Sequence, residues 1–199
     1  MDNKIKIKVY PGVEVEKWRF STAPTLEITT CIPIKGCVVD CVFCPQRLLE
    51  TKYEGDKILT LDNYKKILDK VPNEIRITFA GFTEPWMNKH CSDMVVYAHE
   101  KGHPVSIFTT GIGMTISDFE KIKHIPWAPN PNGGFVLHLP DEERLAKHPL
   151  TKGYLELLEH IHKEQHHIHN FWTMAMGPVH SCASHLFQNV AVGEMWARA

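Results

Sequence analysis

The sequence predicts an α/β fold in which short parallel strands alternate with helices. The strand-like segments are mostly apolar, and stretches with the 3.6-residue hydrophobic period of a helix separate most of them. This alternation is typical of βαβ units. Right-handed crossovers between such units close into full or partial barrels, or make doubly wound sheets. The residues that carry reactive chemistry also follow the strands directly, which favours one shared site at the carboxyl edge of the sheet.

Five strands are expected from β-prone or alternating residues: Leu26–Cys31, Ile75–Phe79, Val105–Thr109, Phe135–Leu139 and Ile168–Met176. Apolar residues at helical spacing indicate helices at Leu61–Val71, Cys91–Ala98 and Tyr154–Ile161. Gly102 is expected to stop the second of these. Ser117 and Glu120 form a capping-box pattern behind Ile116, which predicts a further short helix.

Neither end of the chain fits this pattern as clearly. Residues 1–24 are expected to form an N-terminal strand or hairpin, and the tail from Ala183 is expected to be helical. A sixth strand is irregular, supplied by the tail, or missing because the barrel is truncated. A missing strand would leave an unpaired sheet edge, which needs cover from a helix, a loop or a second subunit. A homodimer is expected if a second subunit supplies that cover.

Size and composition bound the class of protein. At 199 residues the chain is expected to be a single domain, with an extension at 1–24, a core at 25–182 and a tail at 183–199. A formal net charge of −1 gives no basic surplus for binding nucleic acid. No apolar run approaches a membrane span or a signal core, so we expect no membrane partner and a cytoplasmic location. In a reducing compartment, six cysteines favour metal binding over disulfides.

The most informative motif is the run GCVVDCVFCPQ, which places Cys37, Cys41 and Cys44 in a C-x3-C-x2-C spacing after the first strand. Three thiolates on one loop can hold three corners of a cubane iron–sulfur cluster, whereas four would saturate all four irons. One iron would then stay open for another molecule. The alternative is a structural zinc site with Cys31 as the fourth ligand, although zinc sites more often use paired C-x2-C units.

Together with two further motifs, the cysteine run resembles the radical S-adenosylmethionine enzymes. Phe43 occupies the aromatic position of their C-x3-C-x-aromatic-C motif. The run Phe79-Ala80-Gly81-Phe82-Thr83-Glu84-Pro85 is similar to their Gly-Gly-Glu-Pro motif, and Thr109-Thr110-Gly111 is similar to their Thr-Asn-Gly stretch. The resemblance runs from about Thr25 to about Met176.

The resemblance implies a partial (β/α)6 barrel that binds a [4Fe–4S] cluster and S-adenosylmethionine. Reductive cleavage of S-adenosylmethionine would give a 5′-deoxyadenosyl radical that takes a hydrogen atom from a peptide or small-molecule substrate. A low-potential electron donor such as flavodoxin or ferredoxin is implied as well. The alternative function is a non-catalytic zinc- or iron–sulfur-binding module.

The same resemblance assigns roles to single residues. Cys37, Cys41 and Cys44 would ligate the cluster, and Phe43 would lie near the adenine. Gly81, Phe82, Thr83, Glu84 and Pro85 would face the methionine amino group, with Glu84 organising the turn rather than acting as an acid or base. Thr109, Thr110 and His138 would face the methionine or the ribose, and Met174–Val179 would contact the adenine. The catalytic residues proper stay unassigned.

Several residues allow both a structural and a functional interpretation. Cys31, Cys91 and Cys182 are expected in the core, with a second-cluster ligand or hydrogen-atom exchange as the alternative for Cys182. His180 is either a surface residue or a substrate-binding or proton-relaying one. The histidine-rich run between His160 and His169 is interpreted as a polar helix end and loop, and Trp127 as either a packing or a lid residue.

Overall fold

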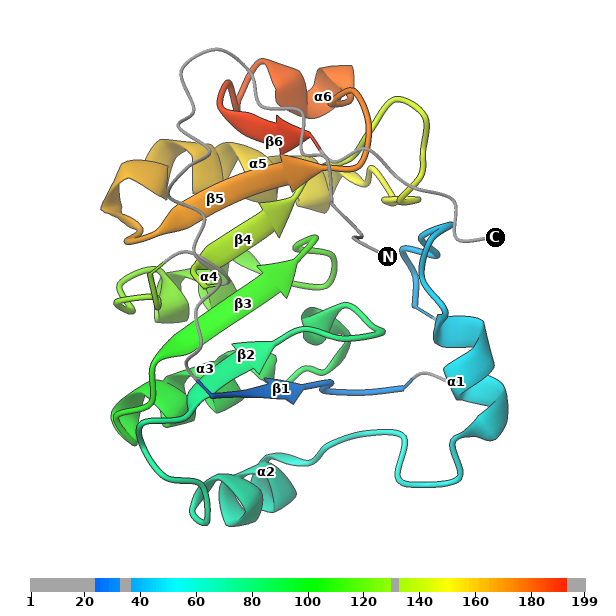
Figure 1. Cartoon of the computed structure of the whole chain (residues 1–199). Coiled ribbons are helices and arrows are strands. Elements are labelled where there is room, and N and C mark those ends of the chain that lie inside the picture. Colours follow the sequence, from blue (N-terminus) through cyan, green and yellow to red (C-terminus); the bar gives the residue numbers. More distant parts are fainter. Residues whose placement is uncertain (1–23, 33–36, 130–132, 193–199) are drawn as a thin grey trace, which may run out of the picture.

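The computed structural model describes residues 24–32, 37–129 and 133–192, and Figure 1 shows them as one layer of strands with helices packed beside it. All six described strands belong to one sheet in the order β1-β2-β3-β4-β5-β6, and every neighbouring pair is parallel. The strands are β1 Thr25–Ile28, β2 Arg76–Phe79, β3 Val105–Thr109, β4 Phe135–His138, β5 Phe171–Ala175 and β6 Val190–Val192. The helices are α1 Gln46–Lys52, α2 Leu61–Leu68, η2 Pro85–Met87, α3 Cys91–Glu100, α4 Ile116–Ile122, α5 Lys152–Glu164, η3 Gln165–His167 and α6 Ser181–Ser184. The predicted α/β fold with alternating parallel strands and helices is therefore confirmed.

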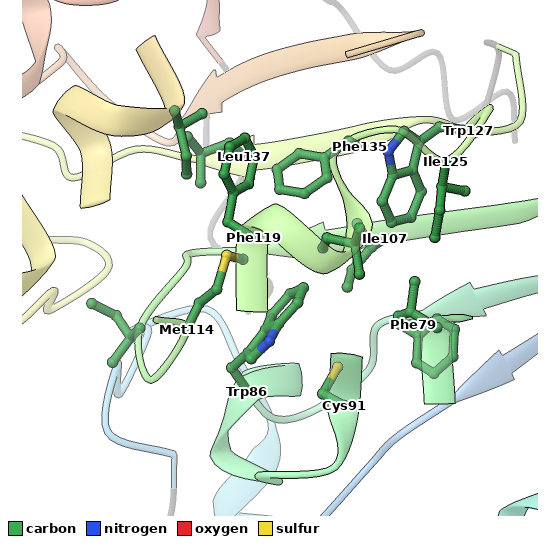
Figure 2. Close-up of a cluster of buried hydrophobic side chains, with 14 of the residues drawn as sticks. Phe79, Trp86, Cys91, Ile107, Met114, Phe119, Ile125, Trp127, Phe135 and Leu137 are labelled. Atoms are coloured by element: carbon green, nitrogen blue, oxygen red, sulfur yellow. The ribbon is translucent and has the colours of Figure 1, made fainter. Parts of the chain in front are cut away.

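The main core lies between the sheet and the helices that connect its strands. Ile77 and Phe79 on β2 and Val105 and Ile107 on β3 are buried in it. Helices α2, α3, α4 and α5 contact one another in chain order, and α3 also contacts β3. Figure 2 shows Trp127 inside this core, and its ring packs against that of Phe135 at 5.3 Å between centroids. Trp127 is therefore a packing residue and not a lid.

The helix ends follow ordinary capping chemistry, with one correction. The Thr60 and Thr151 hydroxyls accept backbone N–H bonds at the starts of α2 and α5. The capping box of α4 is formed by Thr115 and Asp118, so the prediction of Ser117 with Glu120 was wrong. The pattern of a hydroxyl followed three residues later by an acid occurs twice in this segment, and only the earlier pair sits where the chain enters the helix from extended backbone.

The C-terminal part of the chain also departs from expectation. Helix α6 ends at Ser184, and the tail then supplies the sixth strand at Val190–Val192, which pairs with β5 from Thr173 to Ala175. The prediction of a helical tail was wrong over this segment, because a three-residue strand is too short for periodicity to reveal. Since β6 covers the edge of β5, the argument for a homodimer from a missing strand loses its basis.

The remaining predictions on chain organisation fall partly outside the structure. The expected N-terminal strand or hairpin at 1–24 lies almost wholly outside the described residues, as does the end of the tail. Within the described ranges, no helix is long and apolar enough to cross a membrane.

Candidate functional site

A pocket of about 240 Å³ opens at the carboxyl edge of the sheet. In Figure 1 the strand arrows point toward the side of the molecule where α1 and the loop before it lie. The pocket is lined by residues of the cysteine loop (residues 37–44), of the loop after β2, and of the ends of β3, β4 and β5: Cys37, Val39, Cys41, Phe43, Cys44, Gln46, Ala80, Gly81, Phe82, Thr83, Glu84, Pro85, Phe108, Thr109, Thr110, Val136, His138 and Met174. Every residue that the sequence assigned to the cluster or to S-adenosylmethionine by single position is among them.

The cysteine loop folds into tight turns that direct its three thiols to one pocket. The Asp40 N–H donates to the Cys37 carbonyl (3.1 Å), and the Cys44 N–H donates to the Cys41 carbonyl (3.1 Å). Asp40 adopts a positive φ of 42°, which aspartate tolerates better than most residues. These two turns bring residues that are up to seven positions apart onto the same side of the loop.

Helix α1 follows this loop at once, and sequence reasoning missed both the helix and its role. The Cys37 N–H donates to Oε1 of the Gln46 side chain at 2.7 Å, so the first turn of α1 ties down the start of the cysteine loop. Gln46 is buried and lines the pocket. Pro45, which precedes α1 directly, was the available signal, since proline is favoured at helix starts.

The three thiols share a poorly solvated environment. Burial, together with the neighbouring Cys37 and Cys44, raises the pKa of Cys41 to about 12. Burial also raises the pKa values of Cys37 and Cys44. The Glu84 N–H donates to the Cys37 sulfur at 3.3 Å, which favours the thiolate there. Because a metal binds the thiolate, loading this loop must release protons into a site that disfavours the free anions.

The three cysteines of the loop supply soft thiolate donors, which are the usual ligands of iron–sulfur clusters. Within the described ranges, no group of three or more His, Cys, Asp or Glu side chains lies close enough together to hold a metal ion as the side chains stand. The fourth zinc ligand considered above, Cys31, lines a different pocket, and its sulfur lies 3.9 Å from the Thr83 hydroxyl.

Gly81 lets the loop after β2 turn sharply beside β1. Its φ is +108°, and a Cβ atom built there would lie 2.0 Å from the Thr29 hydroxyl oxygen. No larger residue fits this position without moving the backbone or the Thr29 side chain. The turn places the next four residues, Phe82 to Pro85, along the pocket wall.

We expect Gly81→Ala to lower the free energy of unfolding by about 2 kcal/mol, since it adds both a clash and an unfavourable φ. Urea unfolding measures this loss. Adding Thr29→Ala should recover part of it, because the clash disappears and the backbone strain stays. A Gly153→Ala variant is the control, since a Cβ at Gly153 meets nothing within 4 Å. Equal stability of Gly81→Ala and wild type would contradict the requirement for glycine at this turn.

Glu84 joins the loop after β2 to the end of β3. Its carboxylate accepts hydrogen bonds from the Thr109 hydroxyl, from both the N–H and the hydroxyl of Thr110 (2.7 Å each), and from the Trp86 N–H (3.3 Å). The side chain is only 4% exposed. Burial raises the pKa of Glu84, and the donors of Thr109, Thr110 and Trp86 oppose that rise. The residue therefore organises the backbone, in line with the role expected from the sequence.

His138 lines the pocket from the end of β4. Its ring lies 6.4 Å from that of Phe43 and 5.6 Å from that of His148, between centroids. The buried Nε2 atom has no hydrogen-bond partner among the described residues, although His138 lines the pocket. Burial, with a smaller effect from His148, lowers the pKa of His138 to about 4. His138 thus presents a neutral imidazole to the pocket at physiological pH.

This buried histidine makes stability depend on pH. The folded pKa of about 4 lies below the unfolded value of 6.5, so the contribution is full above pH 6.5 and is lost as the pH falls toward 4. A shift of this size corresponds to about 3 kcal/mol. We expect His138→Gln to flatten the dependence of the unfolding free energy between pH 7 and pH 4.5, measured in urea. The pKa of His148 is lowered too, so some slope should persist; an unchanged slope would refute the role of His138.

The other residues singled out from the sequence do not line this pocket. Cys91 is fully buried in the core and Cys31 is 5% exposed, as predicted, while Cys182 is partly buried against the core. His180 accepts the Cys182 N–H at the start of α6 and lies 3.9 Å from the Glu142 carboxylate. The histidine-rich run forms the end of α5 and the short helix η3, as expected.

Of the segment Met174–Val179, Met174 alone lines the pocket. Val39, Phe108 and Val136 also line it, and no sequence pattern marked them. Val39 belongs to the cysteine loop, whereas Phe108 on β3 and Val136 on β4 are register partners and therefore share one face of the sheet. Comparison with protein-family models and with curated proteins finds no match to this chain. The chemistry of the pocket therefore carries the functional argument.

Proposed function

We propose that this chain is a radical S-adenosylmethionine enzyme with one [4Fe–4S] cluster held by Cys37, Cys41 and Cys44. The observation that carries the proposal is one pocket that collects three separate stretches of sequence: the cysteine loop, Gly81–Pro85 and Thr109–Thr110. A structural metal loop has no need of the other two stretches. Their convergence at the carboxyl edge of a parallel sheet is the arrangement expected of a reactive centre.

Two features of the site suit the proposed cluster. The three thiols lie in a shared, poorly solvated environment, where thiolates are favoured only when a metal neutralises them. The Glu84 N–H points at the Cys37 sulfur, and hydrogen bonds to sulfur help to set a cluster potential. When bound, the cluster would supply the electron that cleaves S-adenosylmethionine reductively, with a 5′-deoxyadenosyl radical as the hydrogen-abstracting product.

The chain's own residues would bind and orient the sulfonium compound. The loop Gly81–Pro85 offers backbone groups to the methionine amino group, and Glu84 holds that loop against Thr109 and Thr110. Phe43, which is 41% exposed at the pocket, offers an aromatic face to the adenine. The neutral His138 Nε2 can donate or accept a hydrogen bond on the ribose or methionine side, according to its tautomer.

The apolar part of the pocket would keep water from the reactive product. Phe82, Phe108, Val136 and Met174 line it beside the polar groups. Excluding water is the contribution that a protein makes when its cofactor carries the difficult chemistry. The substrate in this proposal is a peptide or a small molecule, and the electron donor is a low-potential protein such as flavodoxin or ferredoxin.

The proposal includes a finer description of the fold, in which the six parallel strands curve into a partial (β/α)6 barrel. The sequential strand order and the chain-order contacts among α2 to α5 support it. In such a barrel the strand ends surround the site from several sides, which matches a pocket lined from β2, β3, β4 and β5.

Anaerobic purification tests the proposal directly. The visible spectrum and the iron and sulfide content report a cluster, and incubation with S-adenosylmethionine and dithionite reports cleavage to 5′-deoxyadenosine. A brown protein with about four irons per chain that forms 5′-deoxyadenosine is the expected result. A colourless protein with one zinc would instead support the non-catalytic alternative.

A further inference from the structure

A segment distant in sequence holds the cysteine loop from one side. The Val42 N–H donates to the Leu145 carbonyl (2.9 Å), and the Lys147 N–H donates to the Val39 carbonyl (2.7 Å). Residues 141–148 are called the strap below. Both loop residues lie between the first and the last of the three cysteines, so the strap restrains the part of the loop that sets their spacing.

A buried carboxylate fixes the strap itself. The Asp141 side chain accepts the Leu145 N–H at Oδ1 (2.8 Å) and the Ala146 N–H at Oδ2 (3.1 Å). Asp141 is 1% exposed, and its backbone pairs with Val179 in an isolated antiparallel bridge. Hydrogen bonds to an ionised acceptor are stronger than those between neutral groups. Leu145 therefore links Asp141 to the cysteine loop: its N–H donates to the Asp141 side chain, and its carbonyl accepts the Val42 N–H.

The far end of the strap contacts the end of β4, where His138 lines the pocket. The His148 side chain is 4% exposed, with Nε2 3.0 Å from the His138 carbonyl and Nδ1 3.0 Å from the Ala146 carbonyl. Its ring also packs against those of His138 and Tyr154. The strap thus spans from the end of β4, where His138 lines the pocket, to the back of the cysteine loop.

We propose that Asp141 is a positioning residue of this site. It acts through the strap to hold Cys37, Cys41 and Cys44 at the spacing needed to bind their metal group. This inference rests on the proposed function, in which the three cysteines hold an iron–sulfur cluster. The attachment of the cysteine loop to the strap does not depend on the proposed function, since it consists of hydrogen bonds within the chain. A binding site needs such support, because loosely held ligands bind metals poorly.

Site-resolved alkylation of the reduced, chelator-treated full chain tests the attachment. An isotope-coded alkylating reagent and mass spectrometry give a separate rate for each cysteine. We expect Asp141→Asn to raise the alkylation rate at Cys41 about tenfold. The substitution removes one of the two hydrogen bonds that the Asp141 side chain accepts from Leu145 and Ala146, so the cysteine loop opens more often. Cys91 is fully buried in the core and reports global unfolding, so its rate should stay far below that of Cys41 and should rise steeply with urea, whereas the Cys41 rate at low urea should not.

The neighbouring carboxylate provides a matched control. Glu142 accepts the Ser181 N–H on α6 and makes no contact with the cysteine loop in the described structure. Glu142→Gln should therefore leave the rate at Cys41 at the wild-type value. If the Cys41 rate in Asp141→Asn rises with urea as steeply as the Cys91 rate does, Cys41 is exposed by global unfolding alone and the inference is overturned, as it is if the Cys41 rate does not rise above wild type.

Anaerobic reconstitution separates this inference from the proposed function. We expect Asp141→Asn to retain severalfold less iron and sulfide than wild type and Glu142→Gln, measured at a temperature at which all three chains are folded. Equal iron and sulfide in Asp141→Asn and wild type would overturn a role toward the cluster. If wild type takes up no cluster, the proposed function fails, and the alkylation rates still decide whether Asp141 positions the loop.

Discussion

Replacing Cys41 with alanine abolishes the brown colour, the bound iron and sulfide, and the formation of 5′-deoxyadenosine, if the pocket holds the proposed cluster. Changes to groups that only support a metal ligand typically cost 10- to 100-fold, so the loss of a ligand itself should exceed about 100-fold. Iron and sulfide analysis and chromatographic detection of 5′-deoxyadenosine measure both effects. The fold should persist, because Cys41 lies at the pocket and not among the fully buried residues of the core.

Two other cysteines make this experiment decisive. Cys182 is partly buried and does not line the pocket, so Cys182→Ala should keep wild-type colour and cleavage. Cys31→Ala should also keep the colour, whereas a four-cysteine zinc site would lose its metal with Cys31 as readily as with Cys41. Retained cleavage in Cys41→Ala would refute the ligand assignment.

Glu84→Ala is expected to lower the free energy of unfolding by about 3 kcal/mol and to prevent the binding of S-adenosylmethionine. The substitution strips the acceptor from four donors on Thr109, Thr110 and Trp86 in a buried site, and an unsatisfied buried donor costs about 1–3 kcal/mol. Water that enters the vacated space would offset part of this sum. Urea unfolding measures the stability, and equilibrium dialysis against S-adenosylmethionine measures the binding.

Graded variants separate the carboxylate from its volume. Glu84→Gln keeps the size and part of the accepting capacity, so it should cost about half as much as alanine. Glu120→Ala removes an exposed carboxylate that pairs with His160 on the outer helices, and it should cost under about 1 kcal/mol. If Glu84→Ala proves no more costly than Glu120→Ala, the carboxylate does not hold the two loops together.

The agreement between sequence and structure is closest where a pattern repeats within one element. The strands at Val105–Thr109 and Phe135–His138 and the helix at Lys152–Glu164 carry enough alternating or 3.6-period residues to be recognised alone. Helix α1 and strand β6 are short, and no periodicity develops over seven or three residues. Their existence depends on what lies beside them: Gln46 bonds the cysteine loop, and Val190–Val192 pairs with β5.

The sequence by itself determined the class of fold and the identity of the candidate ligands, because strand–helix alternation and cysteine spacing are local properties of the chain. The strap, by contrast, joins residues about one hundred positions apart, such as Val42 and Leu145, and no local pattern marks them. The tertiary structure likewise decided that Cys31 lines a different pocket from the other three thiols, and that His138 is buried enough to stay neutral. Burial and long-range hydrogen bonds depend on the packing of distant segments, which only the folded chain specifies.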